Sequence, residues 1–248
     1  MKMKIILRIF AFACVVLATS CEIDNYDGPD ATITGKFLDS ETGELVGTDI
    51  RDGNEIGVYE LGWTSESRQT WYVTNTGEYT NNLVFASTYR LEFTNCNFYP
   101  FVVNDFVLNA GDNMHDFTVT PFIRIKNPSI TYDSATKTVK ATFNVEAGGN
   151  DVTLSEIRLF AFTDMWVGNY IKFGITNEDC YKKVSSEAIS SEINPSTQYE
   201  LTINVDDNAS SFEYTRNYYF RIGALANVPD VGTVRYNYSP LEVINIAR

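Results

Sequence analysis

Two tryptophans lie in polar segments, where a flat exposed ring could stack under a sugar. Trp63 is surrounded by Gly, Thr, Ser and Glu residues, and Trp166 is followed closely by Asn169 and Tyr170. Aromatic rings pack against the apolar faces of ligands, while amides and carboxylates bond their hydroxyl groups. We therefore predict glycan binding by Trp63, or by Trp166 with Asn169 and Tyr170. The alternative for each Trp is ordinary packing, which we expect for Trp71 on an apolar strand face.

The sequence offers little material for catalysis. His115 is the single histidine, and its alternation with apolar residues predicts a partly buried structural role. The Gly-x-Ser-x-Gly elbow of hydrolases is absent from the sequence. Two carboxylates can form a glycosidase site without fixed spacing, but such a cleft needs more chain than two small domains provide. We expect no enzymatic activity and no catalytic residue.

Metal and cofactor binding are not expected either. Two acidic groups, at residues 24–30 and 206–208, lack the alternate ligand spacing, the Gly and the distal Glu of an EF-hand loop. Cys96 and Cys180 belong to no Cys-x-x-Cys pair and lie in polar, loop-like contexts. They also fall in different predicted domains, and a disulfide requires close Cβ atoms, so we expect no bridge between them.

Cys21 has the most distinctive sequence context. Residues 1–20 combine a basic start, an apolar run and a short stretch of small and polar residues that ends at this cysteine, which is typical of a secretory signal peptide. The apolar run is too short for a good membrane span. The segment Leu17–Cys21 resembles a bacterial lipoprotein signal, whose cysteine is acylated and becomes the mature N-terminus. The alternative is an ordinary secreted protein with a chance cysteine.

The chain is strongly acidic. Its 19 basic and 32 acidic residues give a net charge of −13, and removal of residues 1–20, which carry three bases and no acid, changes this to −16. Such a charge excludes the basic footprint of a nucleic-acid-binding protein. Residues 21–30 are acidic with Gly and Pro, which predicts a solvated tether. They also resemble the surface-export signal of lipoproteins in glycan-degrading Gram-negative bacteria, with a plain spacer as the alternative.

Alternating apolar residues recur along the mature chain and predict antiparallel strands with one buried face. Four runs show this period: residues 89–93, 139–145, 201–205 and 218–224. Turn signals separate the predicted strands, at residues 41–44, 75–78 and 147–150. A sustained helical stripe of apolar residues is absent from the sequence. The predicted fold class is all-β, with sandwiches.

The predicted domain boundary lies near two prolines, Pro121 and Pro128, that bracket a short apolar piece. We predict a signal peptide over residues 1–20, an acidic tether over 21–30 and two tandem β-sandwiches over 31–120 and 121–248. Each of the two sandwich segments is long enough to bury a core of its own.

Both predicted domains resemble known sandwiches. Ala31–Glu44, with its Asp-x-x-Thr-Gly turn, and Thr76–Leu91 resemble parts of carboxypeptidase-regulatory, transthyretin-like domains. Asn194–Thr197 and the tyrosine-bearing run Tyr218–Ala224 resemble fibronectin type III or immunoglobulin-like domains. In this order, the mature chain resembles the lipoprotein family of domain of unknown function 3823. Residues 95–100 depart from the family pattern, and the resemblance gives them no role.

The family resemblance implies a place beside a TonB-dependent porin and its starch-binding lid lipoprotein in the outer membrane. The function expected is therefore that of a non-catalytic, lipid-anchored cell-surface protein of a polysaccharide-utilisation system, which binds or presents glycan. The alternative is a structural accessory or spacer that docks to the porin complex without touching sugar. Asp133–Ala135 resembles the O-glycosylation motif of exported proteins in such bacteria, so Ser134 is a candidate for modification, with an ordinary turn as the alternative.

Overall fold

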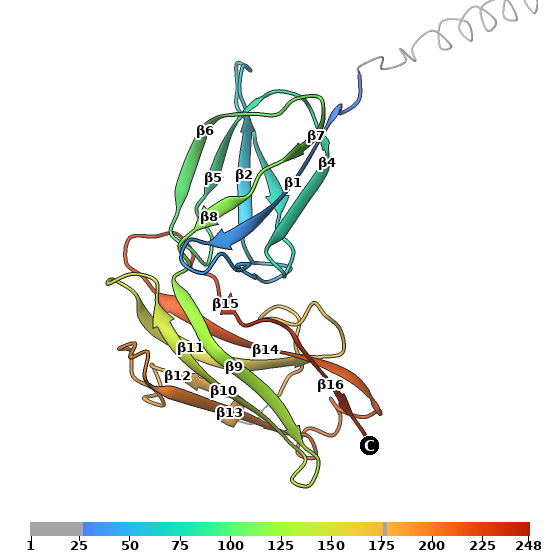
Figure 1. Ribbon diagram of the computed structural model, residues 1–248, viewed down its shortest axis with the longest axis vertical. Coiled ribbons are helices and arrows are strands. Elements are labelled where there is room, and N and C mark those ends of the chain that lie inside the picture. The colour runs from blue at the N-terminus through green and yellow to red at the C-terminus, as the bar shows by residue number, and fades with distance from the viewer. Residues whose placement is uncertain (1–26, 176–177) are drawn as a thin grey trace, which may run out of the picture.

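The computed structural model describes residues 27–175 and 178–248 (Figure 1). The predicted signal peptide, Cys21 and most of the predicted tether lie outside this part of the chain. Within the described residues the structure is built from strands, with one short 3₁₀ turn at Glu178–Cys180. No helix in the described residues is long and apolar enough to cross a membrane. The all-β fold class predicted from the sequence is confirmed.

The first domain packs two four-stranded sheets face to face, one with the order β4-β1-β7 and β8 beside β1, the other with the order β3-β2-β5-β6 (Figure 1). Its strands are β1 (Ala31–Asp39), β2 (Glu55–Glu60), β3 (Arg68–Tyr72), β4 (Glu78–Val84), β5 (Thr88–Phe93), β6 (Phe101–Val107), β7 (Gly111–Met114) and β8 (Phe117–Val119). The predicted strand at residues 89–93 is confirmed as β5, with Tyr89, Leu91 and Phe93 buried.

Aromatic rings fill the space between these two sheets. Phe37 on β1 lies at the centre, with ring centroids of Phe98 and Phe117 at 5.2 and 5.6 Å. Rings at these separations attract each other beyond their area of contact. Trp71 is buried in the same core, as predicted.

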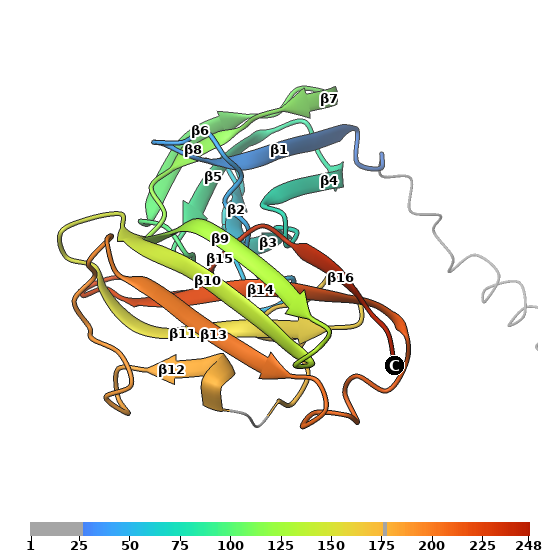
Figure 2. The same ribbon diagram turned by 60° about the horizontal axis from the view of Figure 1, so that its bottom comes forward.

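The second domain packs a three-stranded sheet, in the order β13-β10-β9, on a five-stranded sheet that contains β12, β11, β14, β15 and β16 (Figure 2). Its strands are β9 (Ile123–Asp133), β10 (Thr138–Ala147), β11 (Thr153–Phe162), β12 (Tyr181–Lys183), β13 (Gln198–Asn204), β14 (Arg216–Asn227), β15 (Asn237–Tyr238) and β16 (Glu242–Ile246). The predicted strands at 139–145, 201–205 and 218–224 are confirmed, and their apolar faces form the core.

A tyrosine fixes one corner of this second sandwich. The Tyr218 hydroxyl donates to the carbonyl of Tyr214 at 2.8 Å, four positions upstream. This is the tyrosine corner of immunoglobulin-like sandwiches, in which a buried hydroxyl bonds the backbone a few residues before it. The resemblance of the run 218–224 to that fold therefore has a structural basis.

The expectation for His115 needs correction, and the structure adds burial to what the sequence indicates for the two cysteines. His115 is exposed rather than partly buried, because β7 ends at Met114 and the chain leaves the sheet there, although its ring still packs on Phe117 at 4.7 Å. Cys96 and Cys180 lie outside the strands, as their sequence contexts indicate, Cys96 in a bend after β5 and Cys180 in the 3₁₀ turn, but both side chains are buried, each in a different core. Burial raises the pKa of the Cys96 thiol to about 12. As expected, no disulfide joins these two described cysteines.

Candidate functional site

Trp63 lies on the loop between β2 and β3, and 67% of its surface is exposed. Strand β2 starts beside Asn54, which bonds Asn97 at the contact with the second domain, and runs away from that contact. The loop therefore stands at the remote end of the first domain (Figure 1). An exposed indole with no core to enter is available for stacking on a ligand.

Local contacts hold this loop in place. Gly62 adopts a φ of 98°, a conformation that favours glycine. Just before it, the Leu61 amide donates to the carbonyl of Thr88 at 2.9 Å. Glu66 pairs with Arg90 at 2.9 Å, and the Arg90 guanidinium lies 4.3 Å from the Tyr59 ring centroid. Contacts at both ends of the loop thus position the indole.

A shallow pocket of about 300 Å³ adjoins the Trp63 ring. Its lining combines the ring with a carboxylate, a side-chain amide and hydroxyl groups, from Glu60, Trp63, Thr64, Ser65, Ser67 and Gln69. These are the groups that can hydrogen-bond sugar hydroxyls while a ring covers an apolar sugar face. The polar surroundings of Trp63 in the sequence predict an exposed ring, but they do not predict that Glu60 and Gln69 line the same pocket, which depends on the β2–β3 hairpin.

The segment with Trp166, Asn169 and Tyr170 lies elsewhere, at the contact between the two domains. Trp166 is half-buried, and the Asn169 amide donates to the Tyr238 hydroxyl at 2.9 Å. Tyr170 is 48% exposed, but the Arg51 guanidinium lies over its ring and donates to its hydroxyl. One face of this ring is therefore already covered. The two predicted tryptophan sites are separate surfaces and cannot form one platform.

Arg221 on β14 joins the two domains. Its guanidinium donates to the carbonyls of Thr48 and Asn75 in the first domain, at 2.9 and 3.2 Å, and to Ser239 in its own domain at 3.3 Å. At Gly47 an added Cβ would lie 2.6 Å from the guanidinium and 3.0 Å from the Asn75 carbonyl oxygen, so any side chain there would displace Arg221 from its bonds. Burial lowers the pKa of Arg221 to about 10, which leaves it charged at neutral pH. The alternation of the run 218–224 puts Arg221 on the face opposite the core of its own domain, and the first domain covers that face.

Asparagine side chains complete this contact, which we call the domain joint (Thr48, Asn54, Asn75, Asn97, Arg221 and Asn237). Asn97 donates to the carbonyls of Gly47 and Tyr236 at 2.8 and 2.9 Å, and Asn237 donates back to the Asn97 carbonyl at 2.9 Å. Buried amides satisfied in this way specify one arrangement of the partners. Asn97, from the segment 95–100 to which the family resemblance gives no role, bonds residues of both domains in the joint.

A buried ion pair also connects the two domains. Arg124 on β9 donates to both carboxylate oxygens of Asp39 on β1, at 2.6 and 2.8 Å. Burial opposes ionisation of Asp39, but the hydrogen bonds from Arg124 and from the Glu41 amide, with the charge of Arg124, outweigh it and hold the pKa of Asp39 below its usual value of 3.8. Such bidentate pairs add geometric specificity as well as energy.

The Asp39 pair predicts a loss of stability in acid. A carboxyl group whose pKa is lower in the folded state stabilises the protein above its unfolded-state pKa, and this contribution disappears as the pH falls below 3.8 through the folded-state pKa. We expect an Asp39→Asn variant to be less stable than the wild type at pH 7. The difference should shrink as the pH falls below 3.8, measured by urea unfolding at each pH. A difference that is constant over pH 2–7 would contradict this assignment.

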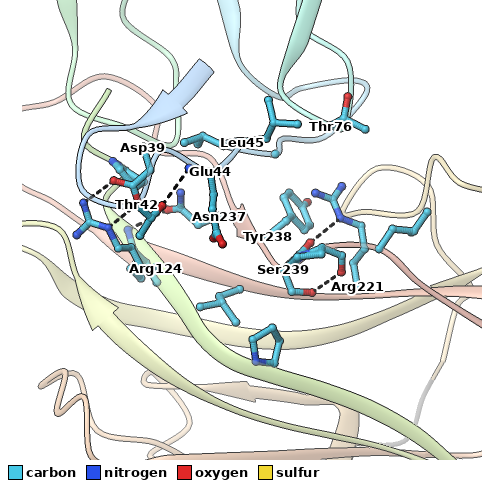
Figure 3. Close-up of a pocket in the computed structure, with 18 of the residues that line it drawn as sticks. Asp39, Thr42, Glu44, Leu45, Thr76, Arg124, Arg221, Asn237, Tyr238 and Ser239 are labelled. Atoms are coloured by element: carbon cyan, nitrogen blue, oxygen red, sulfur yellow. Dashed lines mark hydrogen bonds and ion pairs between the residues drawn. The ribbon is translucent and has the colours of Figure 1, made fainter. Parts of the chain in front are cut away.

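A cleft of about 720 Å³ opens beside the joint, between the two domains (Figure 3). The turn that follows β1, the start of β9 and residues 237–241 line it, and Figure 3 shows Asp39, Arg124, Asn237 and Arg221 along its walls. These polar groups already bond within the protein. Apolar side chains dominate the remaining surface, and Leu45 and Met165 are 44% and 42% exposed at its rim. The volume is within the range of small-molecule pockets.

Ser134, the candidate for modification, is accessible in the structure. Ser134 lies in the exposed turn between β9 and β10, where Asp133 accepts a hydrogen bond from the Ala135 amide at 2.8 Å. The modification of Ser134 stays a prediction. Among the described residues, no cluster of three His, Cys, Asp or Glu side chains could hold a metal ion.

Nearly all of the described chain is similar to known protein families. The family model "Protein of unknown function (DUF3823) N-terminal domain" matches residues 31–120, and the model "Domain of unknown function (DUF3823_C)" matches residues 123–242. No curated protein matches the sequence.

Solved structures extend this similarity. A candidate carbohydrate binding protein from Bacteroides uniformis is 51% identical, with a TM-score of 0.83 over 88% of this chain and 100% of that one. A DUF3823 family protein from Parabacteroides merdae is 17% identical, with a TM-score of 0.66 over 88% of this chain and 100% of that one. A second Bacteroides uniformis protein of that family is 22% identical, with a TM-score of 0.62 and the same coverage. The last two show a shared fold.

Proposed function

This chain belongs to the DUF3823 family, and from that premise we propose that it is a non-catalytic lipoprotein of the outer-membrane surface that binds glycan for a polysaccharide-utilisation system. The observation that carries the proposal is Trp63, an exposed ring held beside a carboxylate, an amide and hydroxyls. The 51% identical relative from Bacteroides uniformis, a candidate carbohydrate binding protein, supports it.

Replacement of Trp63 by alanine tests the proposal. We expect retardation on glycan-containing gels to disappear, because a stacked ring contributes about 0.5–1.5 kcal/mol in comparable aromatic pairs and surface affinities of this kind are weak. Stability should change by less than about 0.5 kcal/mol, since the ring is exposed. Affinity electrophoresis and thermal melting measure the two effects.

The matched control is Tyr72→Ala, which removes another ring with 67% of its surface exposed, on β3. This variant should bind glycan as the wild type does. Retardation that persists in Trp63→Ala, or that Tyr72→Ala abolishes equally, would contradict a specific role for Trp63.

The proposed membrane anchor is Cys21, which lies outside the described residues. Replacement by alanine should release the protein from membranes into the soluble fraction, because several acyl chains, at about 0.8 kcal/mol for each buried methylene, would be lost. Fractionation and intact mass spectrometry check this result. A mature protein that starts at Cys21 and carries no lipid mass would disprove the anchor.

The cleft beside the joint favours a second candidate function, that of an accessory docked to a TonB-dependent porin complex with its lid lipoprotein. Its rim exposes Leu45 and Met165, and apolar surface of this kind marks contacts with partners. Co-purification with the outer-membrane complex, together with the absence of any glycan retardation of the wild-type protein, would place this function ahead of glycan binding.

A further inference from the structure

We infer that the Trp63 site selects neutral glycans and rejects polyanionic ones, such as chains of uronic acids or sulfated sugars. This inference rests on the proposed glycan-binding function, and it names the class of ligand that the same site accepts.

The first step is the charge of the pocket itself. Among its lining residues, Glu60 is the one charged group, and its carboxylate makes no ion pair with any residue that the structure describes. Its negative charge is therefore not neutralised. The acidic mature chain, with a net charge of −16, adds a long-range field of the same sign.

The second step is that the neighbouring cations are already paired. Arg68 lies 3.6 Å from the Glu55 carboxylate. Arg90 pairs with Glu66 at 2.9 Å and with Glu92 at 3.1 Å, and also covers the Tyr59 ring. A uronate or sulfate group at this site would find no unpaired guanidinium among them, although recognition of such anions normally depends on one.

The third step is what the pocket offers to a neutral sugar. A carboxylate accepts hydrogen bonds from two hydroxyls, and the Gln69 amide and the Ser and Thr hydroxyls both donate and accept. A neutral pyranose on Trp63 can satisfy all of these groups. An anionic sugar would place like charges together in the same contact, which is how a binding site discriminates against the wrong ligand.

The experiment uses one glycan in two charge states. A panel of gels first identifies the neutral polysaccharide that retards the full mature protein most strongly. Its primary hydroxyls are then oxidised to carboxylates, and retardation is measured in gels that contain either form. The Trp63→Ala variant is run beside the wild type in every gel. The difference in mobility between the two proteins then reports binding through Trp63, because the charge of the gel affects both equally. We expect the oxidised glycan to bind at least about tenfold more weakly, equivalent to 1.4 kcal/mol. Salt at 1 M should reduce this difference in affinity between the neutral and the oxidised glycan (the gap), because it screens charges beyond about 3 Å.

Two charge variants make the test specific. Glu60→Gln should reduce the gap between the two glycan forms to about twofold, since it removes the unpaired charge in the pocket. Glu44→Gln changes the net charge equally, but it lies at the cleft between the domains and should leave the gap unchanged. Equal effects of the two variants would show that net charge alone discriminates, which would overturn the role of Glu60.

The outcomes separate this inference from the proposed function. Binding of the oxidised glycan, or of a natural polyanionic glycan, through Trp63 with at least the affinity of the neutral form would overturn the inference and leave glycan binding intact. If no glycan, neutral or anionic, retards the wild type more than Trp63→Ala, the proposed function is overturned, and this inference with it.

Discussion

Arg221→Ala is expected to lower the free energy of unfolding by about 3–5 kcal/mol, because it removes three hydrogen bonds to buried carbonyls of both domains; among these, the Asn75 carbonyl keeps the Thr48 amide as a donor. The guanidinium bonds Thr48 and Asn75 across the joint and Ser239 within the second domain. Its loss also removes the cation over the Tyr238 ring, whose centroid lies 4.1 Å away. Urea unfolding measures the change in free energy, and calorimetry should show one transition in the wild type separating into two.

Arg216→Ala is the matched control for this prediction. Arg216 lies on the same strand and donates to the Thr163 carbonyl at 3.0 Å, but it is exposed. Its replacement should change the free energy of unfolding by less than about 0.5 kcal/mol. An intermediate effect is expected for Arg221→Lys, which keeps the charge but not the planar fork of donors. If Arg221→Ala loses no more stability than Arg216→Ala, the joint does not couple the domains.

The strands of both domains could be predicted because alternation reports burial on one face. Val139, Ala141, Phe143 and Val145 are all buried on β10, as their spacing indicates. The run Tyr218–Ala224 could be assigned to a tyrosine-bearing strand because its pattern resembles that of immunoglobulin-like domains. In each case the information is local, within one strand or one turn, so the sequence is sufficient.

The domain joint could not be predicted, because its residues gain their roles only when two distant surfaces meet. Arg221 has the spacing of a solvent-facing residue on a half-buried strand, and nothing local indicates that the first domain covers it. Asn97 lies 140 positions from Asn237, with which it bonds. A pattern of period two describes one sheet and carries no information about what packs on its second face.

The Trp63 site lies between these two cases. The exposure of the Trp63 ring could be predicted from its polar neighbours, because a Trp that is not flanked by apolar residues is seldom part of a core. The groups that would bind a sugar beside it come from the end of β2 and from β3, so their proximity depends on the hairpin register, in which Val58 pairs with Gln69. Tyr170 has a similar sequence context, yet Arg51 covers its ring. Sequence context thus finds exposed rings but does not say which of them remain free.

Phe220→Ala should lower the free energy of unfolding by about 3–5 kcal/mol, through loss of buried area and the cavity that remains. Phe220 neighbours Arg221 on β14 but faces the opposite way, into the core of the second sandwich, where its exposure is 0%. Its ring stacks on Phe212 at a centroid distance of 6.4 Å. The control is Val243→Ala on β16, 45% exposed, with an expected change below about 0.5 kcal/mol.

The two β14 variants should fail differently. Phe220→Ala weakens the second domain itself, so its melting should move to lower temperature while the contacts of Arg221 persist until that domain unfolds. Arg221→Ala weakens the contact between domains and leaves each core intact. Limited proteolysis near the melting temperature distinguishes them: Phe220→Ala should release a protected first domain, whereas Arg221→Ala should be cut first near residues 119–123, where the chain passes between the domains. Identical cleavage patterns in both variants would mean that the two faces of β14 do not act independently.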